Sequence, residues 1–279
     1  SWKRLKKDWG KPDIVQMNVL DKNGLIALWL KQRYHIPYTI IEHWSGYLPA
    51  NFAFRSGWHG WIMRKIAQEA SCILPVSQML EDAMKNCGIT NTHWQRIHNV
   101  VDDFFYQPIT PITITPKGNK FRFLHVSCFD EKAKNIQGIL RGARKIANER
   151  QDFELVIIGT GVDYKMDVDY AKSLNFPEGI VHFIGEQTPL QVAEWMQQSD
   201  AFVLFSRFET FAIVLAEAMA VGIPIICSKT AGIAEYLPTE CGVVVEVDDD
   251  VSFTEALREM VAHHNKYSPE QIRKHGQQY

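Results

Sequence analysis

The chain has 279 residues, of which 46% are hydrophobic and 22% are charged, with a formal net charge of -2 at pH 7. This composition is typical of a soluble globular protein and excludes a disordered chain, a collagen-like chain and a broadly basic nucleic-acid binder. The best apolar stretch, residues 212–227, is interrupted by Glu217 and Pro224. It is shorter than the roughly 20 residues that a membrane-spanning helix needs, which excludes an integral membrane protein.

Five cysteines are scattered along the chain without a C-x-x-C pair. This pattern predicts reduced thiols in a cytoplasmic protein rather than a disulfide framework. The chain starts with Ser1, and no apolar segment of a signal peptide follows it. We therefore expect a fragment or a processed chain.

Charge and proline content divide the chain in two. Residues 1–109 carry 13 Lys and Arg against 9 Asp and Glu, a net +4, whereas the remainder is net acidic by 6. Pro108, Pro111 and Pro116 fall close together between the halves, where they disfavour a helix or a central strand. We expect a domain at 1–108, a linker at 109–120 and a second domain at 121–279.

In both halves, short apolar segments alternate with amphipathic ones. In the first half we expect strands at 14–17, 38–41, 73–76 and 96–100, with helices at 25–33, 64–69 and 78–85. In the second half we expect strands at 121–127, 155–158, 180–184, 201–205, 223–227 and 243–245, with helices at 136–147 and 210–221. Strands that are apolar throughout are typical of parallel sheets covered on both faces. The chain is therefore predicted to form two doubly wound α/β domains, which bind ligands at the carboxyl ends of their strands.

Helix starts carry recognisable caps in the second half. Thr188 is placed as an N-cap, with Pro189 at the first helical position and Gln191 as the capping-box partner. Ser252 and Ser268 are expected to open the last two helices in the same way. The acidic run Asp248–Asp250 precedes Ser252, so we expect a helix cap there rather than a metal site.

The segment after the strand at 201–205 has the properties of a phosphate site. The first amides of the helix that follows (Phe211, Ala212 and Ile213) lack intrahelical acceptors, and the helix dipole is positive there. Glu209 precedes this start and Glu217 lies two turns inside the helix, where carboxylates could accept hydrogen bonds from sugar hydroxyls. Spacing alone leaves a second interpretation open, in which the negative charge of Glu209 stabilises the helix N-terminus electrostatically and Glu217 is a solvated surface residue.

Several motifs occur together in one order. Glu209-x7-Glu217 is followed by Ala-Met-Ala-x-Gly-x-Pro, preceded by Leu-Val-Ile-Ile-Gly-Thr-Gly at 155–161, and continued by Ala-Gly-Ile-Ala-Glu at 231–235. In the first half, Ile-Glu-His at 41–43 and His-Asn-Val-Val-Asp at 98–102 fit the same pattern. Across nearly the whole chain, the sequence resembles the family 4 retaining glycosyltransferases of GT-B fold. The resemblance implies two Rossmann-like domains facing a cleft, with the N-terminal domain incomplete and the chain partial.

The resemblance also implies roles for individual residues. Glu209 would contact hydroxyls of the donor sugar, His43 would lie near that sugar, and Lys134 would bind the diphosphate. Further donor-binding residues would come from the helix start and from the base pocket: Thr210, Phe211, Ala212, Ile213, Glu217, Phe183 and Ile184. No metal and no cofactor is implied.

Two positions depart from the family pattern. The family has an arginine shortly before the lysine, and Cys128 or Asp130 stands there instead, so that one phosphate cation is replaced. The family glycine in Glu-x-Phe-Gly is Ala212, which is a mild change.

We therefore expect an enzyme that transfers a hexose from a UDP- or GDP-sugar to a glycan or lipid-linked glycan, in surface polysaccharide or glycolipid synthesis. A nucleotide-sugar epimerase of GT-B fold and a non-catalytic sugar-nucleotide binding module are the alternatives. No nucleic-acid partner is expected. The basic segment 2–7 has two interpretations, an exposed helix face or a peripheral contact with anionic lipid on the inner face of the membrane.

Overall fold

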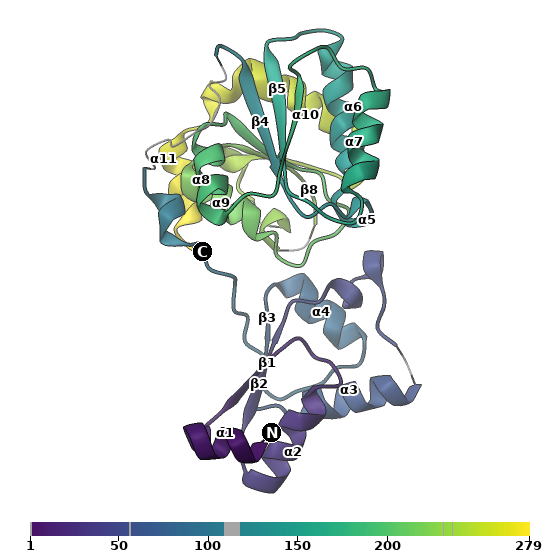
Figure 1. Cartoon of the computed structure of the whole chain (residues 1–279), viewed down its shortest axis with the longest axis vertical. Helices are drawn as coiled ribbons and strands as arrows, with labels where there is room; N and C mark the ends of the chain where they lie inside the picture. Colours follow the sequence, from purple (N-terminus) through teal and green to yellow (C-terminus); the bar gives the residue numbers. More distant parts are fainter. Residues whose placement is uncertain (1, 56, 109–117, 231, 236) are drawn as a thin grey trace. The chain divides into compact units, whose positions relative to one another are not determined.

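Parallel β-sheets form the centres of the two units into which the chain divides, Ser1–His98 (unit 1) and Asn99–Tyr279 (unit 2) (Figure 1). The computed structural model describes residues 2–55, 57–108, 118–230, 232–235 and 237–279. Most of the predicted linker, residues 109–117, lies outside the described residues, so the predicted domain limits stay a prediction.

Unit 1 contains a three-stranded sheet of order β1-β2-β3. Its strands are β1 (Val15–Asn18), β2 (Tyr38–Glu42) and β3 (Cys72–Pro75). Its helices are α1 (Trp2–Trp9), α2 (Gly24–Tyr34), α3 (Gly57–Glu69) and α4 (Gln78–Asn86), with short 3-10 turns η1 (Ser45–Tyr47) and η2 (Pro49–Asn51) after β2.

The predicted strand at 96–100 is wrong. Here the chain beside β3 forms an isolated bridge between Ile73 and Trp94 and a bond from the Ile97 amide to the Pro75 carbonyl, and residues 96–100 form no strand. Ile97 is 42% exposed and Val100 is 80% exposed, so these apolar side chains are not covered as those of a sheet strand would be.

Unit 2 contains a six-stranded parallel sheet of order β6-β5-β4-β7-β8-β9. From β4 the chain winds outward to β6, then returns to β7 beside β4 and winds outward in the other direction. The carboxyl ends of β4 and β7 therefore flank a topological switch point, where open α/β sheets bind ligands. The strands are β4 (Phe121–Val126), β5 (Phe153–Ile158), β6 (Val181–Gly185), β7 (Ala201–Leu204), β8 (Ile225–Ser228) and β9 (Gly242–Val245).

Helices cover this sheet in two groups, as the prediction of a doubly wound domain requires. One group contains α6 (Ile136–Ala147), α7 (Tyr164–Ser173) and α10 (Asp250–His263), and the other contains α8 (Pro189–Gln197), α9 (Ile213–Val221) and α11 (Pro269–Gly276). Shorter elements are α5 (Glu131–Lys134) and the 3-10 turns η3 (Asp103–Tyr106), η4 (Gly232–Glu235), η5 (Thr239–Cys241) and η6 (His264–Lys266). Phe205, just past β7, stacks on Phe253 of α10 with a ring-centre distance of 4.2 Å.

Helix caps explain where α8, α9 and α10 begin. The predicted capping box of Thr188 and Gln191 is present at α8. Helix α9 begins at Ile213 rather than at Thr210, because Ala212 adopts a left-handed conformation with φ of 59°. At α10 the cap is Asp249, which accepts hydrogen bonds from the Val251 and Ser252 amides, so the expectation that Ser252 opens this helix is wrong.

Glycine 159 lets the ends of β4 and β5 approach each other. Its φ is +133°, and a Cβ atom there would lie 1.9 Å from the Ser127 carbonyl oxygen. The Ser127 amide also donates to the Ile158 carbonyl at 3.1 Å. The end of β5 therefore lies directly against the backbone of Ser127, at the carboxyl end of β4.

None of the helices that the structure describes combines the length and the apolar character needed to traverse a bilayer.

Candidate active site

A cavity of about 450 Å³ opens at the switch point between β4 and β7. Its walls come from the segment after β4, the loop after β7, the first turn of α9 and the start of α8. Among the residues predicted to act on the donor, those that line the cavity are Lys134, Glu209, Thr210, Phe211, Ala212, Ile213 and Glu217. The volume lies in the range of small-molecule sites.

Lys134 and Glu209 form an ion pair in this cavity. The Lys134 ammonium lies 2.6 Å from Glu209 Oε1, and their side chains are 16% and 10% exposed. Glu209 Oε1 also accepts a hydrogen bond from the Ser206 hydroxyl at 2.7 Å. Among the described residues, neither of these two side chains has a further hydrogen-bond partner. Because an ammonium has three donors and each carboxylate oxygen accepts about two hydrogen bonds, two Lys134 donors and Glu209 Oε2 can serve a ligand.

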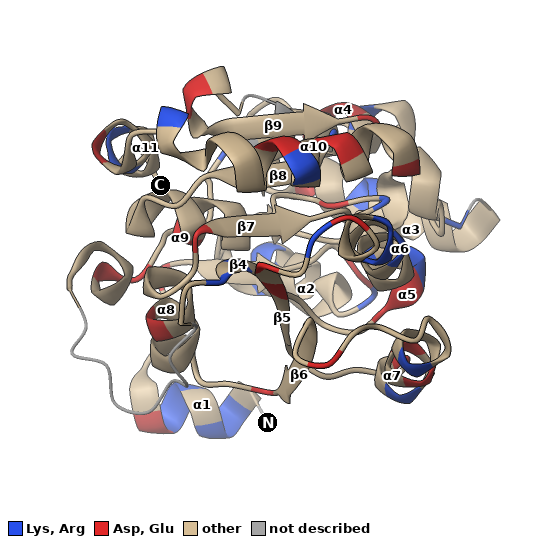
Figure 2. Cartoon of the chain, turned by 90° about the horizontal axis from the view of Figure 1, so that it is seen from above, with Lys and Arg blue, Asp and Glu red and all other residues tan. Residues whose placement is uncertain are grey.

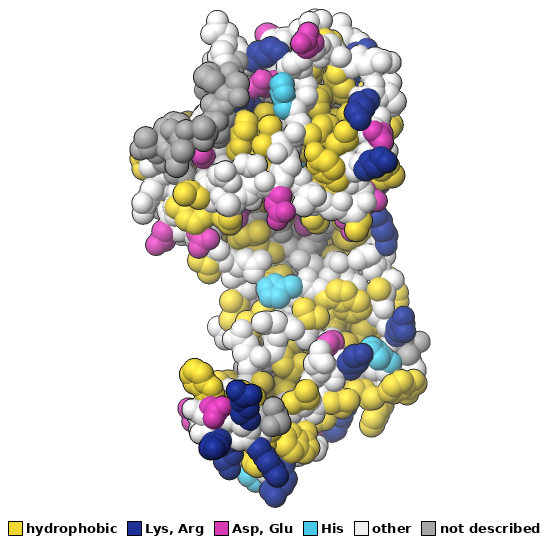
Figure 3. All heavy atoms as spheres, in the orientation of Figure 1, with side chains coloured by type: hydrophobic (Ala, Val, Ile, Leu, Met, Phe, Trp, Pro, Cys, Tyr) yellow, Lys and Arg dark blue, Asp and Glu magenta, His cyan; other side chains and the backbone are white. Residues whose placement is uncertain are grey.

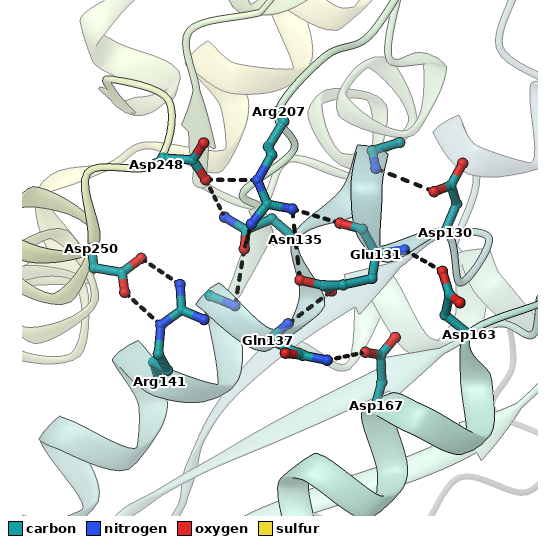
Figure 4. A network of polar contacts seen from close by, with 12 residues as sticks. Asp130, Glu131, Asn135, Gln137, Arg141, Asp163, Asp167, Arg207, Asp248 and Asp250 are labelled. Carbon is teal, nitrogen blue, oxygen red and sulfur yellow. Dashed lines mark hydrogen bonds and ion pairs between the residues drawn. The ribbon is translucent and has the colours of Figure 1, made fainter. Parts of the chain in front are cut away.

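Arg207 lies in the loop that carries Glu209 and binds the residues at both ends of α5, the helix that carries Lys134. Figure 4 shows its contacts with Glu131, Asn135 and Asp248. Its guanidinium donates to the Glu131 carbonyl at 2.6 Å, to Asn135 Oδ1 at 2.8 Å and to Asp248 Oδ1 at 2.8 Å. The Arg207 amide also donates to the Ala133 carbonyl at 2.7 Å. Arg207 thus positions the Glu209 loop against α5 and does not replace the missing phosphate arginine.

The two residues that stand near the position of the family arginine, Cys128 and Asp130, differ in their surroundings. Asp130 caps α5, accepting from the Ala133 amide, and it is not part of the cavity wall. Cys128 lines the cavity as a free thiol. The Asp130 carboxylate therefore does not line the space in front of α9.

The first turn of α9 presents unpaired amides to the cavity. Among the described residues, no backbone acceptor pairs with the amides of Ala212, Ile213 and Val214, while Leu215 already donates to the Ala212 carbonyl. A left-handed conformation costs a residue with a Cβ roughly 1–2 kcal/mol, so the family glycine would be less strained than Ala212. Gly232 packs closely against the backbone of this turn, and a larger residue would not fit, since a Cβ there would lie 2.4 Å from the Phe211 Cα atom.

Glu217 is a half-buried carboxyl without a hydrogen-bond partner among the described residues. Burial, reinforced by the negative charge of Asp102, raises the pKa of Glu217 to about 7. The carboxylate would gain most from ligand hydroxyls that donate hydrogen bonds to it, because these replace the water that burial has removed.

In unit 1, His43 follows β2 in a loop organised by Glu42. The Glu42 carboxylate is 0% exposed and accepts hydrogen bonds from the Leu20, His43 and Trp44 amides. Burial raises the pKa of Glu42, although the hydrogen bonds from these amides act in the opposite direction. Burial lowers the pKa of His43. The same carboxylate holds the turn at Val19, whose φ of 69° is rare for a β-branched residue.

The predicted base-pocket residues lie on the edge strand of unit 2. Phe183 and Ile184 belong to β6 and are not among the residues that line the cavity. The Phe183 ring instead contacts the rings of Phe129 and Tyr164. Their contact with a base stays a prediction.

Sequence reasoning missed His125 and Ser127 at the end of β4. His125 is 0% exposed within a strand whose core neighbours, Phe123 and Leu124, are apolar, and Ser127 lines the cavity. A polar side chain within an apolar strand is the signal that could have found them.

Two family models cover almost the whole chain. The model described as glycosyl transferases group 1 matches residues 112–279, and the model for glycosyltransferase family 4 matches residues 1–103. The chain belongs to these glycosyltransferases. The predicted family is confirmed.

Relatives of this glycosyltransferase act in several glycosylation reactions. The N-acetyl-alpha-D-glucosaminyl L-malate synthase of Bacillus anthracis is 28% identical over 188 residues, 65% of this chain and 48% of that protein. The lipopolysaccharide 1,6-galactosyltransferase of Escherichia coli is 25% identical over 209 residues, 71% of this chain and 55% of that protein. The chain spans about half the length of the curated relatives it matches.

Solved structures confirm the predicted GT-B fold. Sucrose-phosphate synthase from Thermosynechococcus elongatus superimposes with a TM-score of 0.83 at 19% identity, covering 99% of this chain and 71% of that chain. The Anabaena protein HepE in complex with UDP and glucose gives a TM-score of 0.81 at 19% identity, covering 99% and 76%.

The raised pKa of Glu217 predicts how the stability of this glycosyltransferase depends on pH. An unfolded glutamate titrates near 4.5, so the folded state binds more protons than the unfolded state between about pH 4.5 and 7. Stability should therefore fall as pH rises through this window, with Glu217 contributing about 1–3 kcal/mol to the loss. Glu217→Gln removes this titration, and urea unfolding at pH 5 and pH 8 measures it. The same pH dependence in wild type and Glu217→Gln would contradict the assignment.

Proposed function

We propose that the chain carries out retaining glycosyl transfer, moving a hexose from a nucleoside-diphosphate sugar to a hydroxyl of a glycan or lipid-linked glycan. The observation that carries this proposal is the Lys134–Glu209 pair beside the unpaired amides of α9, in one cavity at the switch point. A diphosphate needs cations and N–H donors, whereas a sugar needs acceptors for its hydroxyls, and this cavity contains both kinds of group.

The diphosphate would occupy the start of α9. The amides of Ile213 and Val214 and the helix dipole favour an anion there, and the two remaining donors of Lys134 add a positive charge. Negative charge grows on the β-phosphate as the glycosidic bond breaks, so these fixed donors stabilise the transition state more than the ground state. Because this cationic environment is supplied by the chain, the proposed reaction requires no metal.

The sugar would lie against Glu209, whose free Oε2 accepts its hydroxyls, and Glu217 would accept hydroxyls of the ribose. In the retaining course implied by the family resemblance, the acceptor oxygen attacks the anomeric carbon from the face of the leaving group. The bond from that carbon to the phosphate oxygen breaks, and the leaving phosphate takes the acceptor proton. No separate base is needed.

The nucleotide and the acceptor are inferred from relatives. HepE was solved with UDP and with UDP-glucose, which favours a UDP-sugar, while a mannosyltransferase relative from Corynebacterium glutamicum is described as GDP-mannose-dependent. Several relatives are described as enzymes of lipopolysaccharide and lipid-linked glycans, which favours a surface glycan or glycolipid acceptor. An epimerase is not favoured, because Glu42, the carboxylate it would use in unit 1, is fully buried and bonded to backbone amides.

Glu209→Ala should abolish transfer while the chain stays folded. The substitution removes the acceptor for the sugar hydroxyls and leaves Lys134 unpaired, so we expect a loss of at least about 100-fold in kcat/KM, the size typical of one electrostatic group in a transition state. Transfer from UDP-glucose and GDP-mannose to lipid-linked glycan, assayed in EDTA, measures the effect, and circular dichroism checks the fold. Glu246→Ala, which removes an exposed carboxylate paired with Lys229, is the matched control. Transfer at the wild-type rate by Glu209→Ala would overturn the proposal.

We also propose that α1 contacts anionic membrane. This helix carries Lys3, Arg4, Lys6 and Lys7, and its apolar residues Leu5 and Trp9 are 57% and 85% exposed. Figure 2 shows the basic residues along α1, and Figure 3 shows dark-blue side chains gathered over it. Exposed apolar side chains beside clustered cations are the composition of a helix that lies in the headgroup region.

Replacing Lys3, Lys6 and Lys7 together by Gln should weaken vesicle binding about 10–100-fold, since each cation near an anionic surface contributes about 1 kcal/mol. Co-sedimentation with vesicles of phosphatidylcholine and phosphatidylglycerol measures the binding. A triple variant of Lys229, Lys266 and Lys274, which lie in unit 2, is the control with the same charge change. Equal loss in both variants, or no binding by wild type, would contradict the proposal.

A further inference from the structure

A histidine is buried in the centre of the sheet of unit 2. His125 of β4 is 0% exposed, and both of its ring nitrogens have partners. Nδ1 lies 2.9 Å from the Val203 carbonyl oxygen on the neighbouring strand β7, and Nε2 lies 2.8 Å from the Ser127 hydroxyl oxygen. A buried polar group without a hydrogen bond destabilises the folded state, so each ring nitrogen of His125 should either donate to or accept from its partner.

The partners decide which nitrogen carries the proton. A carbonyl oxygen can only accept, so Nδ1 must hold the hydrogen that points to Val203. Burial lowers the pKa of His125 to about 4, the Val203 carbonyl opposes this, and the nearby Lys134 ammonium lowers the pKa further. The ring is therefore neutral near pH 7, and Nε2 can only accept.

The direction of the second bond follows. Ser127 must donate its hydroxyl hydrogen to Nε2, which leaves the oxygen with two lone pairs and no hydrogen for a ligand. Ser127 lines the cavity together with Lys134 and Glu209, and the end of β5 at Ile158 and Gly159 lies against the Ser127 backbone. An oxygen that can only accept repels a phosphate oxygen and binds a group that donates, such as a sugar hydroxyl.

We propose that Ser127, oriented by His125, accepts a hydrogen bond from a hydroxyl of the donor sugar and thereby contributes to the choice of sugar. The role rests on the proposed function. Ser127 is a specificity-determining residue in this scheme, and His125 is a positioning residue that acts through it. The pair is unsuited to nucleophilic catalysis, because an imidazole with so low a proton affinity is a poor base for a serine hydroxyl.

Binding of sugar nucleotide and of bare nucleotide separates this role from a structural one. Titration calorimetry compares UDP-glucose, UDP-galactose, UDP-N-acetylglucosamine and GDP-mannose with UDP and GDP. For the sugar nucleotide that binds most tightly, Ser127→Ala should weaken binding about three- to tenfold, the effect of one neutral hydrogen bond, while the matching nucleoside diphosphate should bind within about twofold of wild type. Ser199→Ala, which removes a buried hydroxyl that donates to the Trp195 carbonyl, is the matched control and should change neither affinity.

His125 variants test the positioning. The amide of His125→Gln can still donate to Val203 and accept from Ser127, whereas His125→Leu can do neither. We compare the affinity for the sugar nucleotide with the affinity for the matching nucleoside diphosphate. The ratio of the first to the second should stay near wild type in His125→Gln. In His125→Leu it should fall as much as in Ser127→Ala. This ratio is independent of a general loss of stability, since both ligands are measured on the same folded protein.

Nitrogen NMR of the free protein supplies a test without ligand. His125 should show a protonated Nδ1 and an unprotonated Nε2 from pH 5 to pH 8, with the signal assigned by its absence in His125→Gln. A protonated Nε2 would overturn the inference, as would an equal loss for sugar nucleotide and nucleotide in Ser127→Ala, or no loss for either. Wild type that binds none of the sugar nucleotides would overturn the proposed function and this role together.

Discussion

The ion pair between Lys134 and Glu209 is the interaction on which the rest of the site depends. It joins a cation suited to a diphosphate to a carboxylate suited to a sugar, at 2.6 Å and largely shielded from water. Holding two long side chains in one geometry costs conformational entropy, so the segments that carry Lys134 and Glu209 must themselves be fixed. The Arg207 guanidinium joins the loop of Glu209 to both ends of α5 through Glu131 and Asn135, and to the segment before α10 through Asp248, so the pair is present without a ligand. Preorganisation of this kind is what allows charged groups to stabilise a transition state.

A second constraint is the backbone around the start of α9. The left-handed Ala212 begins the helix sharply, so that the next amides face the cavity, and Gly232 allows the loop after β8 to lie against Phe211. A glycine also allows close backbone approach at the end of β4, where Gly159 lets β5 lie against Ser127. Strain and close backbone approach thus occur where the cavity forms, as expected of a ligand site.

The alternation of apolar strands and helices predicted parallel sheets covered on both faces. Capping chemistry predicted the start of α8 at Thr188 and Pro189, because a cap depends on residues close in sequence. The family resemblance supplied Lys134, Glu209 and Glu217, which the structure brings to one cavity. The strand expected at 96–100 failed because local apolar content does not reveal that Val100 is exposed. The partners of Arg207 and His125 could not be predicted either: Asp248 is 41 residues from Arg207, and Val203 is 78 residues from His125, so these contacts exist only after the sheet has formed.

The most direct test of the account is a crystal structure of the complex with UDP, or with GDP if that nucleotide binds more tightly. The account predicts that β-phosphate oxygens accept hydrogen bonds from the Ile213 and Val214 amides and from the Lys134 ammonium, with Lys134 still bound to Glu209. A diphosphate seated elsewhere, with these amides facing water, would contradict it.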